Sequence, residues 1–177
     1  WDVSEKDYWM MCVQKTAWYT CITPCRLGAL ISSAVKPDQL AQFVQIGSDL
    51  GVAFQIQDDV LNLIGEEGTY GKEIAGDISE GKRTLMLIHL FRSCTQNESA
   101  ILKKIMSKPR KEKTEVEVYD VLSLMKEYNS IQYAEQKSKQ FAKKASDGFD
   151  QVSSTLPGES AKQVFKNLID FVIERQY

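Results

Sequence analysis

The chain has 177 residues, 43% of them hydrophobic and 26% charged, a balance typical of one globular domain or of part of a larger one. Its net charge of -2 gives no whole-chain reason to expect nucleic acid or an anionic membrane as a partner. No apolar run approaches the roughly 20 residues of a membrane-spanning helix, and a single histidine beside four cysteines argues against a four-ligand zinc site. We therefore interpret the cysteines as buried free thiols in a reducing compartment.

The first helical pattern starts close to the beginning of the chain. Ser4 can cap a helix that begins at Glu5, where the side-chain oxygen would accept a bond from an otherwise unpaired backbone N–H. Because proline lacks a backbone N–H, Pro24 is expected to kink this helix before it continues through residues 27–31.

A second long helix is predicted to open at Pro37 and to run from residue 39 to about residue 64. Gly47 and Gly51 lie four residues apart inside it. Glycine costs roughly 1 kcal/mol relative to alanine in a helix interior. We therefore expect a neighbouring segment or a ligand to pack closely against these two positions.

The helical pattern breaks between Gly65 and Gly81, a segment that holds five of the ten glycines. This density predicts a long loop, and long loops inside compact domains often act as lids or binding loops. Helical pattern resumes from about residue 82 to 91, and further helices are predicted at 99–106, 115–128, 131–149 and 159–175. No sustained period-2 alternation indicates strands, so the predicted fold class is all-α.

The second helix carries a polar cluster inside an otherwise apolar pattern. Gln55, Asp58, Asp59 and Asn62 follow the i, i+3, i+4 and i+7 spacing that places side chains on one helix face. Two adjacent carboxylates repel each other and are costly to desolvate unless a positive group meets them. Mg²⁺ with an attached phosphate suits such oxygen ligands. A helix cap or a solvated patch is the alternative, but the apolar helical pattern continues on both sides of the pair.

Lysines near this cluster are candidates for binding an anion. Lys72 follows Gly71 and Lys82 follows Gly81, and the two lysines flank Asp77. Lysine suits phosphate as a flexible point charge, and glycine lets the backbone approach an anion closely. A solvated surface loop is the alternative interpretation.

A further lysine, Lys15, stands beside Thr16 in an apolar stretch of the first helix. Such a lysine either extends its ammonium group to the surface or is held for a ligand anion, and the sequence alone leaves both open. His89 lies in an apolar run and is interpreted as packed or exposed without chemistry.

These segments together resemble the trans-type isoprenyl diphosphate synthases, or polyprenyl synthetases, and most closely the geranylgeranyl diphosphate synthase kind. The resemblance covers about residues 5–92. It rests on three motifs in the family's order: the pair Lys15-Thr16, the second aspartate-rich motif Phe54-Gln55-x-x-Asp58-Asp59-x-x-Asn62, and the lysine segment from Tyr70 to Thr84.

The resemblance implies an all-α helical bundle of the isoprenoid synthase type, with about six to eight helices in this part. Family members join an allylic diphosphate to isopentenyl diphosphate and release pyrophosphate, with three Mg²⁺ ions held by two aspartate-rich motifs. The allylic cation is attacked by the double bond of isopentenyl diphosphate, and a proton is lost. By resemblance, Asp58 and Asp59 bind Mg²⁺ and are catalytic together with Lys15 and Lys72. Substrate diphosphate is expected to contact Lys15, Thr16, Gln55, Lys72 and Lys82.

The first aspartate-rich motif of the family has no counterpart in these 177 residues. We therefore expect the chain to be the C-terminal portion of a single synthase domain, which binds part of a diphosphate without turning over by itself. Two other interpretations stay open: a non-catalytic partner subunit of such a synthase, and a terpene cyclase. The family implies a homodimer in the cytoplasm or an organelle, whereas product length depends on side chains near the first motif.

Overall fold

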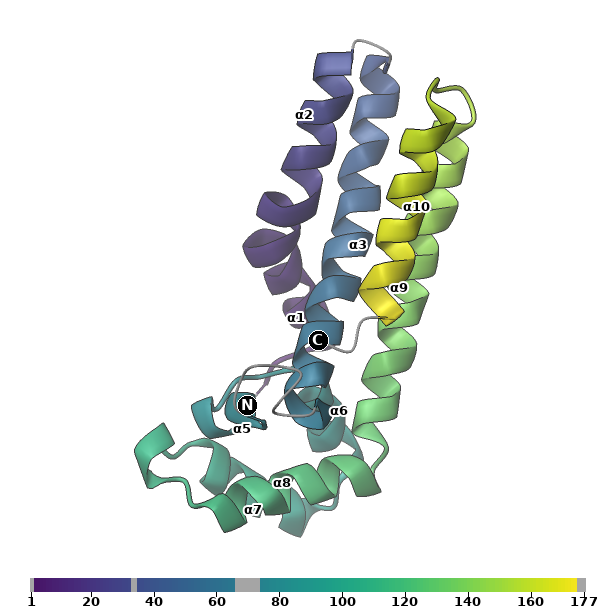
Figure 1. Ribbon diagram of the computed structural model, residues 1–177. Coiled ribbons are helices and arrows are strands. Elements are labelled where there is room, and N and C mark those ends of the chain that lie inside the picture. Colours follow the sequence, from purple (N-terminus) through teal and green to yellow (C-terminus); the bar gives the residue numbers. More distant parts are fainter. Residues whose placement is uncertain (1, 33–34, 66–73, 175–177) are drawn as a thin grey trace. The chain divides into compact units, whose positions relative to one another are not determined.

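The computed structural model describes residues 2–32, 35–65 and 74–174 (Figure 1). Over these residues the regular structure is entirely helical, which confirms the all-α prediction. The chain forms two compact units: the first contains the described parts of residues 1–8 and 58–136, and the second contains residues 9–57 and 137–175. Within the described ranges, no helix is both long and apolar enough to cross a bilayer.

The second unit is a bundle of helices that lie alongside one another in Figure 1. Its members are η1 (Val13–Ile22), α2 (Thr23–Ser32), α10 (Glu159–Glu174), and the larger parts of α3 (Pro37–Ile64) and α9 (Ser130–Ser153). Aliphatic and aromatic side chains from these helices form one buried cluster, which includes Ile46, Leu50, Ala53, Phe149 and Ile169. Phe149 stacks on Phe165 of α10 with ring centroids 4.2 Å apart. Apolar burial of this kind is the main stabilising contribution to a helical bundle.

The segment predicted as the first helix is helical without a break from residue 5 to residue 32, but part of it is a π-helix and not an α-helix. It comprises α1 (Glu5–Cys12), the π-helix η1 and α2. The N–H of Thr23 donates to the carbonyl of Trp18, five residues earlier, as in a π-helix. The departure from α-helical geometry thus lies in residues 13–22, before Pro24, and Pro24 is the second residue of α2.

Two glycines of α3 allow close contact with the π-helix. A Cβ atom on Gly51 would lie 2.3 Å from the Cβ of Ala17, and one on Gly47 would lie 2.9 Å from the Cα of Ile22. Real Cβ atoms essentially never show contacts under 3.0 Å, so glycine permits this approach where a larger residue would push the helices apart. The predicted close packing at Gly47 and Gly51 is confirmed, and the neighbour is η1.

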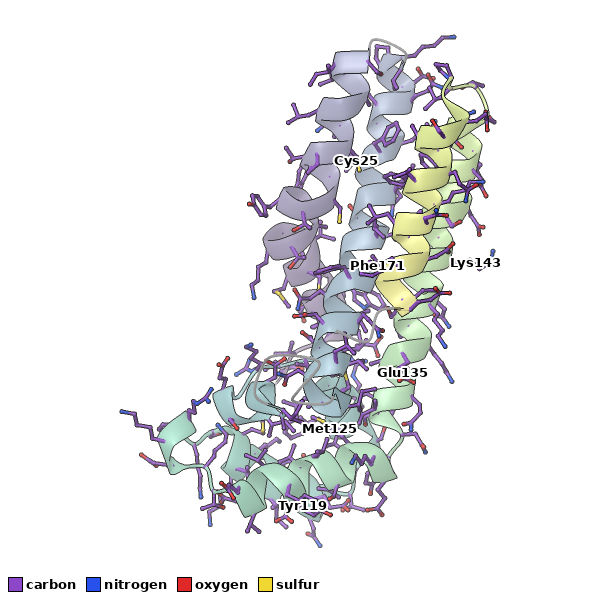
Figure 2. All side chains as sticks on the ribbon, in the orientation of Figure 1. Cys25, Tyr119, Met125, Glu135, Lys143 and Phe171 are labelled. Atoms are coloured by element: carbon purple, nitrogen blue, oxygen red, sulfur yellow. The ribbon has the colours of Figure 1, made fainter. Side chains whose placement is uncertain are left out.

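The first unit consists of α5 (Gly76–Glu80), α6 (Leu85–Ser93), α7 (Gln96–Met106), the 3₁₀-helix η2 (Arg110–Glu112) and α8 (Glu115–Glu127), together with the ends of α1, α3 and α9. Figure 2 labels two residues on opposite faces of α8: Met125 is 1% exposed and Tyr119 is 67% exposed. Helix α8 therefore buries one face against this unit and presents the other to solvent.

The segment predicted as a loop from Gly65 to Gly81 contains a helix. Within its described part, α5 occupies residues 76–80, and Gly81 ends it with a φ of 75°. The N–H of Gly81 donates to the carbonyls of Asp77 and Ile78, which is how a C-terminal glycine satisfies helix carbonyls. The structureless-loop prediction was wrong here, because Gly76 and Gly81 bound a short helix.

Candidate functional site

The paired carboxylates lie in the last two turns of α3. Asp59 is buried with 6% of its surface exposed, whereas Asp58 is half-buried. The hydroxyl of Tyr8, in α1, donates to Oδ2 of Asp59 at 2.7 Å. Both residues belong to the first unit. Sequence reasoning found Asp58 and Asp59 but missed Tyr8.

Asn62 connects the same helix to the lysine segment. Its side-chain Oδ1 accepts the backbone N–H of Asp77 at 2.9 Å, and its backbone carbonyl accepts the N–H of Ala75 at 2.7 Å. The left-handed φ of 57° at Ala75 turns the chain into α5 at this point. Asn62, which the sequence placed among four oxygen-bearing side chains, therefore anchors the start of α5.

Lys82 forms ion pairs inside the lysine segment. Its Nζ lies 2.6 Å from Oδ1 of Asp77 and 3.1 Å from Oε2 of Glu80. The hydrogen bond to Asp77 is the main cause that raises the pKa of the Lys82 ammonium, which burial partly opposes. The Lys82 side chain is still 50% exposed, so it can be reached from solvent while it is held beside Asp77.

A separate polar pair lies in the second unit, between η1 and α3. The Thr16 hydroxyl donates to Oε1 of Gln55 at 2.8 Å, and both residues were predicted to line a diphosphate site. Neighbouring Lys15 is exposed. The close approach at Gly51 lies one turn before Gln55 and touches Ala17, next to Thr16. Lys72, the remaining predicted residue, lies outside the described residues.

The donor set decides which metal these residues suit. Over the described ranges, no group of three or more His, Cys, Asp or Glu side chains is arranged to enclose a metal ion. Mg²⁺ does not need such a cage, because it keeps several waters and binds through one or two carboxylates plus substrate phosphates. The adjacent carboxylates of Asp58 and Asp59 therefore fit Mg²⁺ that is shared with a phosphate.

His89 is packed, which is one of the two placements that the sequence left open. Its Nδ1 lies 3.0 Å from the Ser130 hydroxyl, and its ring stacks on Tyr133 at 4.2 Å between centroids. Tyr133 in turn donates to Oε1 of Glu5 at 2.7 Å, and burial is the first cause that raises the pKa of Tyr133 to about 12. These contacts give His89 a structural role within the first unit.

Comparison with known proteins places this arrangement in a family. The family model for polyprenyl synthetases matches residues 1–125. The geranylgeranyl diphosphate synthase of Sulfolobus acidocaldarius is 33% identical over 177 residues, which are 99% of this chain and 51% of that protein.

Solved structures agree with this match. The geranylgeranyl pyrophosphate synthetase of Pyrococcus horikoshii Ot3 is 30% identical with a TM-score of 0.80, over 98% of this chain and 50% of that one. The geranylgeranyl pyrophosphate synthase of Corynebacterium glutamicum, solved with isoprenyl diphosphate and magnesium, is 23% identical with a TM-score of 0.82, over 97% and 47% of the two chains; that likeness shows the fold alone.

The fold is thus the all-α isoprenoid synthase fold. The chain belongs to the polyprenyl synthetase family. It spans about half the length of the curated relatives that it matches.

Proposed function

We propose that this chain supplies the second aspartate-rich motif and the lysine groups of a prenyltransferase that joins an allylic diphosphate to isopentenyl diphosphate. The observation that carries the proposal is the placement of Asp58 and Asp59, two adjacent carboxylates on a helix packed in apolar surroundings, within a chain of this family. Two adjacent carboxylates repel each other, and a cation bound beside them would relieve that repulsion. The product is a longer polyprenyl diphosphate, such as geranylgeranyl diphosphate.

Asp58 and Asp59 would hold Mg²⁺, as their donor chemistry allows. The bound metal would neutralise negative charge on the diphosphate that leaves the allylic carbon. The chain's own part is to present carboxylate oxygens from a rigid helix. Half-buried Asp58 is the more accessible of the two, and Asp59 is oriented beside it.

The lysines would bind the diphosphate itself. As the carbon–oxygen bond of the allylic diphosphate breaks, charge accumulates on the departing oxygens, and fixed cations stabilise it there. Lys15, Lys72 and Lys82 would provide these cations, and Thr16 and Gln55 would contact the diphosphate as hydrogen-bonding groups. Lys82 is ion-paired with Asp77 and Glu80 in this structure, so a diphosphate would share its ammonium group with these carboxylates or displace them.

The family further supports a homodimer in the cytoplasm or an organelle, and three Mg²⁺ ions in the complete protein. These features extend the proposal beyond the 177 residues of this chain. Because the chain covers about half of its relatives, the complete reaction belongs to the longer protein.

Calorimetric titration of the 177-residue chain with inorganic pyrophosphate, with and without Mg²⁺, tests the binding part of the proposal. We expect magnesium-dependent binding that is weakened at least about tenfold by the double substitution Asp58→Asn, Asp59→Asn, since charged ligands of a metal dominate its affinity. The matched control is Asp120→Asn, Asp170→Asn, which removes two exposed carboxylates and should leave binding unchanged.

Absence of binding in a folded, unaltered chain overturns the proposal and favours the partner-subunit interpretation. The reaction is tested in the complete protein with labelled isopentenyl diphosphate and an allylic diphosphate. Incorporation of label into a longer diphosphate supports a chain-elongating enzyme, whereas release of pyrophosphate without incorporation indicates a cyclase.

A further inference from the structure

The bond between Tyr8 and Asp59 distinguishes the two adjacent carboxylates. Tyr8 is 2% exposed and Asp59 is 6% exposed, and their 2.7 Å hydrogen bond spans 51 residues of sequence. A tyrosine buried this completely must place its hydroxyl on a partner, because an unpaired buried hydroxyl costs about 1–3 kcal/mol. Here the partner is a carboxylate of the candidate metal site.

This hydrogen bond has a defined chemical effect on Asp59. A hydroxyl that donates to a carboxylate makes a charge-assisted bond, which is shorter and stronger than a neutral one. The bond fixes the rotation of the Asp59 carboxylate plane, since Oδ2 is held by a group on another helix. Groups that hydrogen-bond to metal ligands in this way orient the ligands and tune their affinity for the metal.

We propose that Tyr8 is a positioning residue that holds Asp59 in the orientation required for magnesium-dependent diphosphate binding. The proposal rests on the proposed function, because it needs Asp59 to take part in the metal site. Helix α1 thereby contributes to the site through Tyr8, which lies seven residues before the lysine–threonine pair. Tyr8 itself touches neither substrate nor metal in this proposal.

The test compares Tyr8→Phe with Tyr133→Phe in the 177-residue chain. The control is closely matched, because Tyr133 also lies in the first unit and also donates to a carboxylate oxygen at 2.7 Å, that of Glu5. For each variant, pyrophosphate binding is measured by calorimetry at a series of Mg²⁺ concentrations, and folding is checked by urea unfolding. The readout is the Mg²⁺ concentration that gives half-maximal binding.

We expect Tyr8→Phe to raise that concentration by about 10- to 100-fold, the usual effect of removing a group that orients a metal ligand. Tyr133→Phe should leave it within about twofold, even where both variants lose similar stability. An unchanged magnesium requirement in folded Tyr8→Phe overturns the role of Tyr8 and leaves the proposed function standing. Failure of the unaltered chain to bind overturns both.

A second measurement needs no variant and covers the case in which Tyr8→Phe does not fold. In the unaltered chain labelled with ¹³C-tyrosine, addition of Mg²⁺ and pyrophosphate together should shift the ring carbon signal next to the Tyr8 hydroxyl. The corresponding signal of Tyr133 should stay in place. Binding without any change at Tyr8 contradicts the proposal, because a hydroxyl bonded to a metal-site carboxylate must sense that the site is filled.

Discussion

Asn62 uses both its side chain and its backbone to hold the segment before α5. Replacing it by alanine removes the acceptor for the N–H of Asp77, a residue that is 7% exposed. We expect Asn62→Ala to lower the free energy of unfolding by about 1–3 kcal/mol, the cost of leaving a buried donor unpaired. Amide hydrogen exchange at Asp77 should accelerate in parallel.

Asn62→Asp is the informative control for this prediction. Its carboxylate oxygen can accept the same N–H, so exchange at Asp77 should stay slow. Equal exchange rates in Asn62→Ala and the parent chain would show that the Asp77 amide is protected by something other than the Asn62 side chain.

Asp49 of α3 provides a pH-dependent test in the second unit. Burial is the main cause that raises its pKa above 3.8, opposed by the hydrogen bond from Gln45 and by Lys144. Well below pH 3.8 the carboxyl is protonated in both folded and unfolded chains, so its burial does not lower stability through ionisation. As the pH rises, the unfolded chain ionises first, and the folded state loses relative stability until its own carboxyl has ionised.

Asp49→Asn removes this titration and keeps an oxygen that accepts from Gln45. The stability gained over the parent chain should therefore be small near about pH 3.5, grow as the pH rises, and become constant towards neutrality. Urea unfolding of both chains between about pH 3.5 and 7 measures the difference. A difference that does not vary with pH would contradict the burial argument.

At the scale of single residues, the sequence predicted those site residues whose spacing is set within one helix. The spacing of Gln55, Asp58 and Asp59 is set by one helix, so periodicity alone could find them. Tyr8 could not be found this way, since it contacts Asp59 across 51 residues and lies in a helix with no other feature that marks it. Lys82 was found by its position after a glycine, but its ion pair with Asp77 depends on the unpredicted helix α5.

Among the helices, α3 needs glycine at position 51 to pack against η1. Gly51→Ala would place a methyl group against Ala17, so one helix must move. We expect a loss of about 1–3 kcal/mol, as for overpacked cores, together with a weakened Thr16–Gln55 bond. The free energy of unfolding from urea titration measures the first effect.

Gly28→Ala in α2 is the matched control. A Cβ atom at this position would meet nothing within 4 Å. The substitution should therefore stabilise the chain by up to about 1 kcal/mol through helix propensity alone. If both alanines act alike, close packing against η1 is not the reason for glycine at position 51.

The residues that cap α7 explain why this helix starts earlier than predicted. Helix α7 begins at Gln96, earlier than predicted, because Thr95 and Glu98 form a capping box in which each side chain accepts the other's backbone N–H. Helix α8 has the same box at Thr114 and Glu117. Both boxes are visible in the sequence as Thr-x-x-Glu. Helix α5 was harder to predict, since five residues are too few to show periodicity.

For the molecule as a whole, fold class followed from composition and periodicity, because each long helix carries its own pattern. The division of the chain into two compact units could not be predicted from composition and periodicity. Residues 2–8 belong with residues 58–136, and no local pattern reports such distant association. Family membership came from the order and spacing of three motifs, which a helical fold alone would not have indicated.

The cysteines offer a test of burial throughout the chain. None of the four forms a disulfide, and Cys12 and Cys21 are buried whereas Cys25 and Cys94 are partly exposed. Burial raises the pKa of the Cys21 thiol to about 11 and also raises the pKa of Cys25 and Cys94.

Alkylation of the folded chain should modify Cys94 and Cys25 at least about tenfold faster than Cys12 and Cys21, because the latter two thiols are buried. Mass spectrometry of partially alkylated chain gives the order. A reducing agent should not shift the midpoint of unfolding, and a shift would indicate a disulfide that this structure does not contain.

The π-helix η1 has a consequence for how this chain tolerates changes in length. Each hydrogen bond of a π-helix spans five residues, one more than in an α-helix. Residues 13–22 therefore contain more residues per turn than the α-helices on either side. Removing one residue there would let ordinary α-helical pairing resume, whereas removing one from α3 would rotate every later side chain away from its neighbour. Natural variants that differ in length within this bundle should therefore gain or lose residues at η1 before they do so in α3.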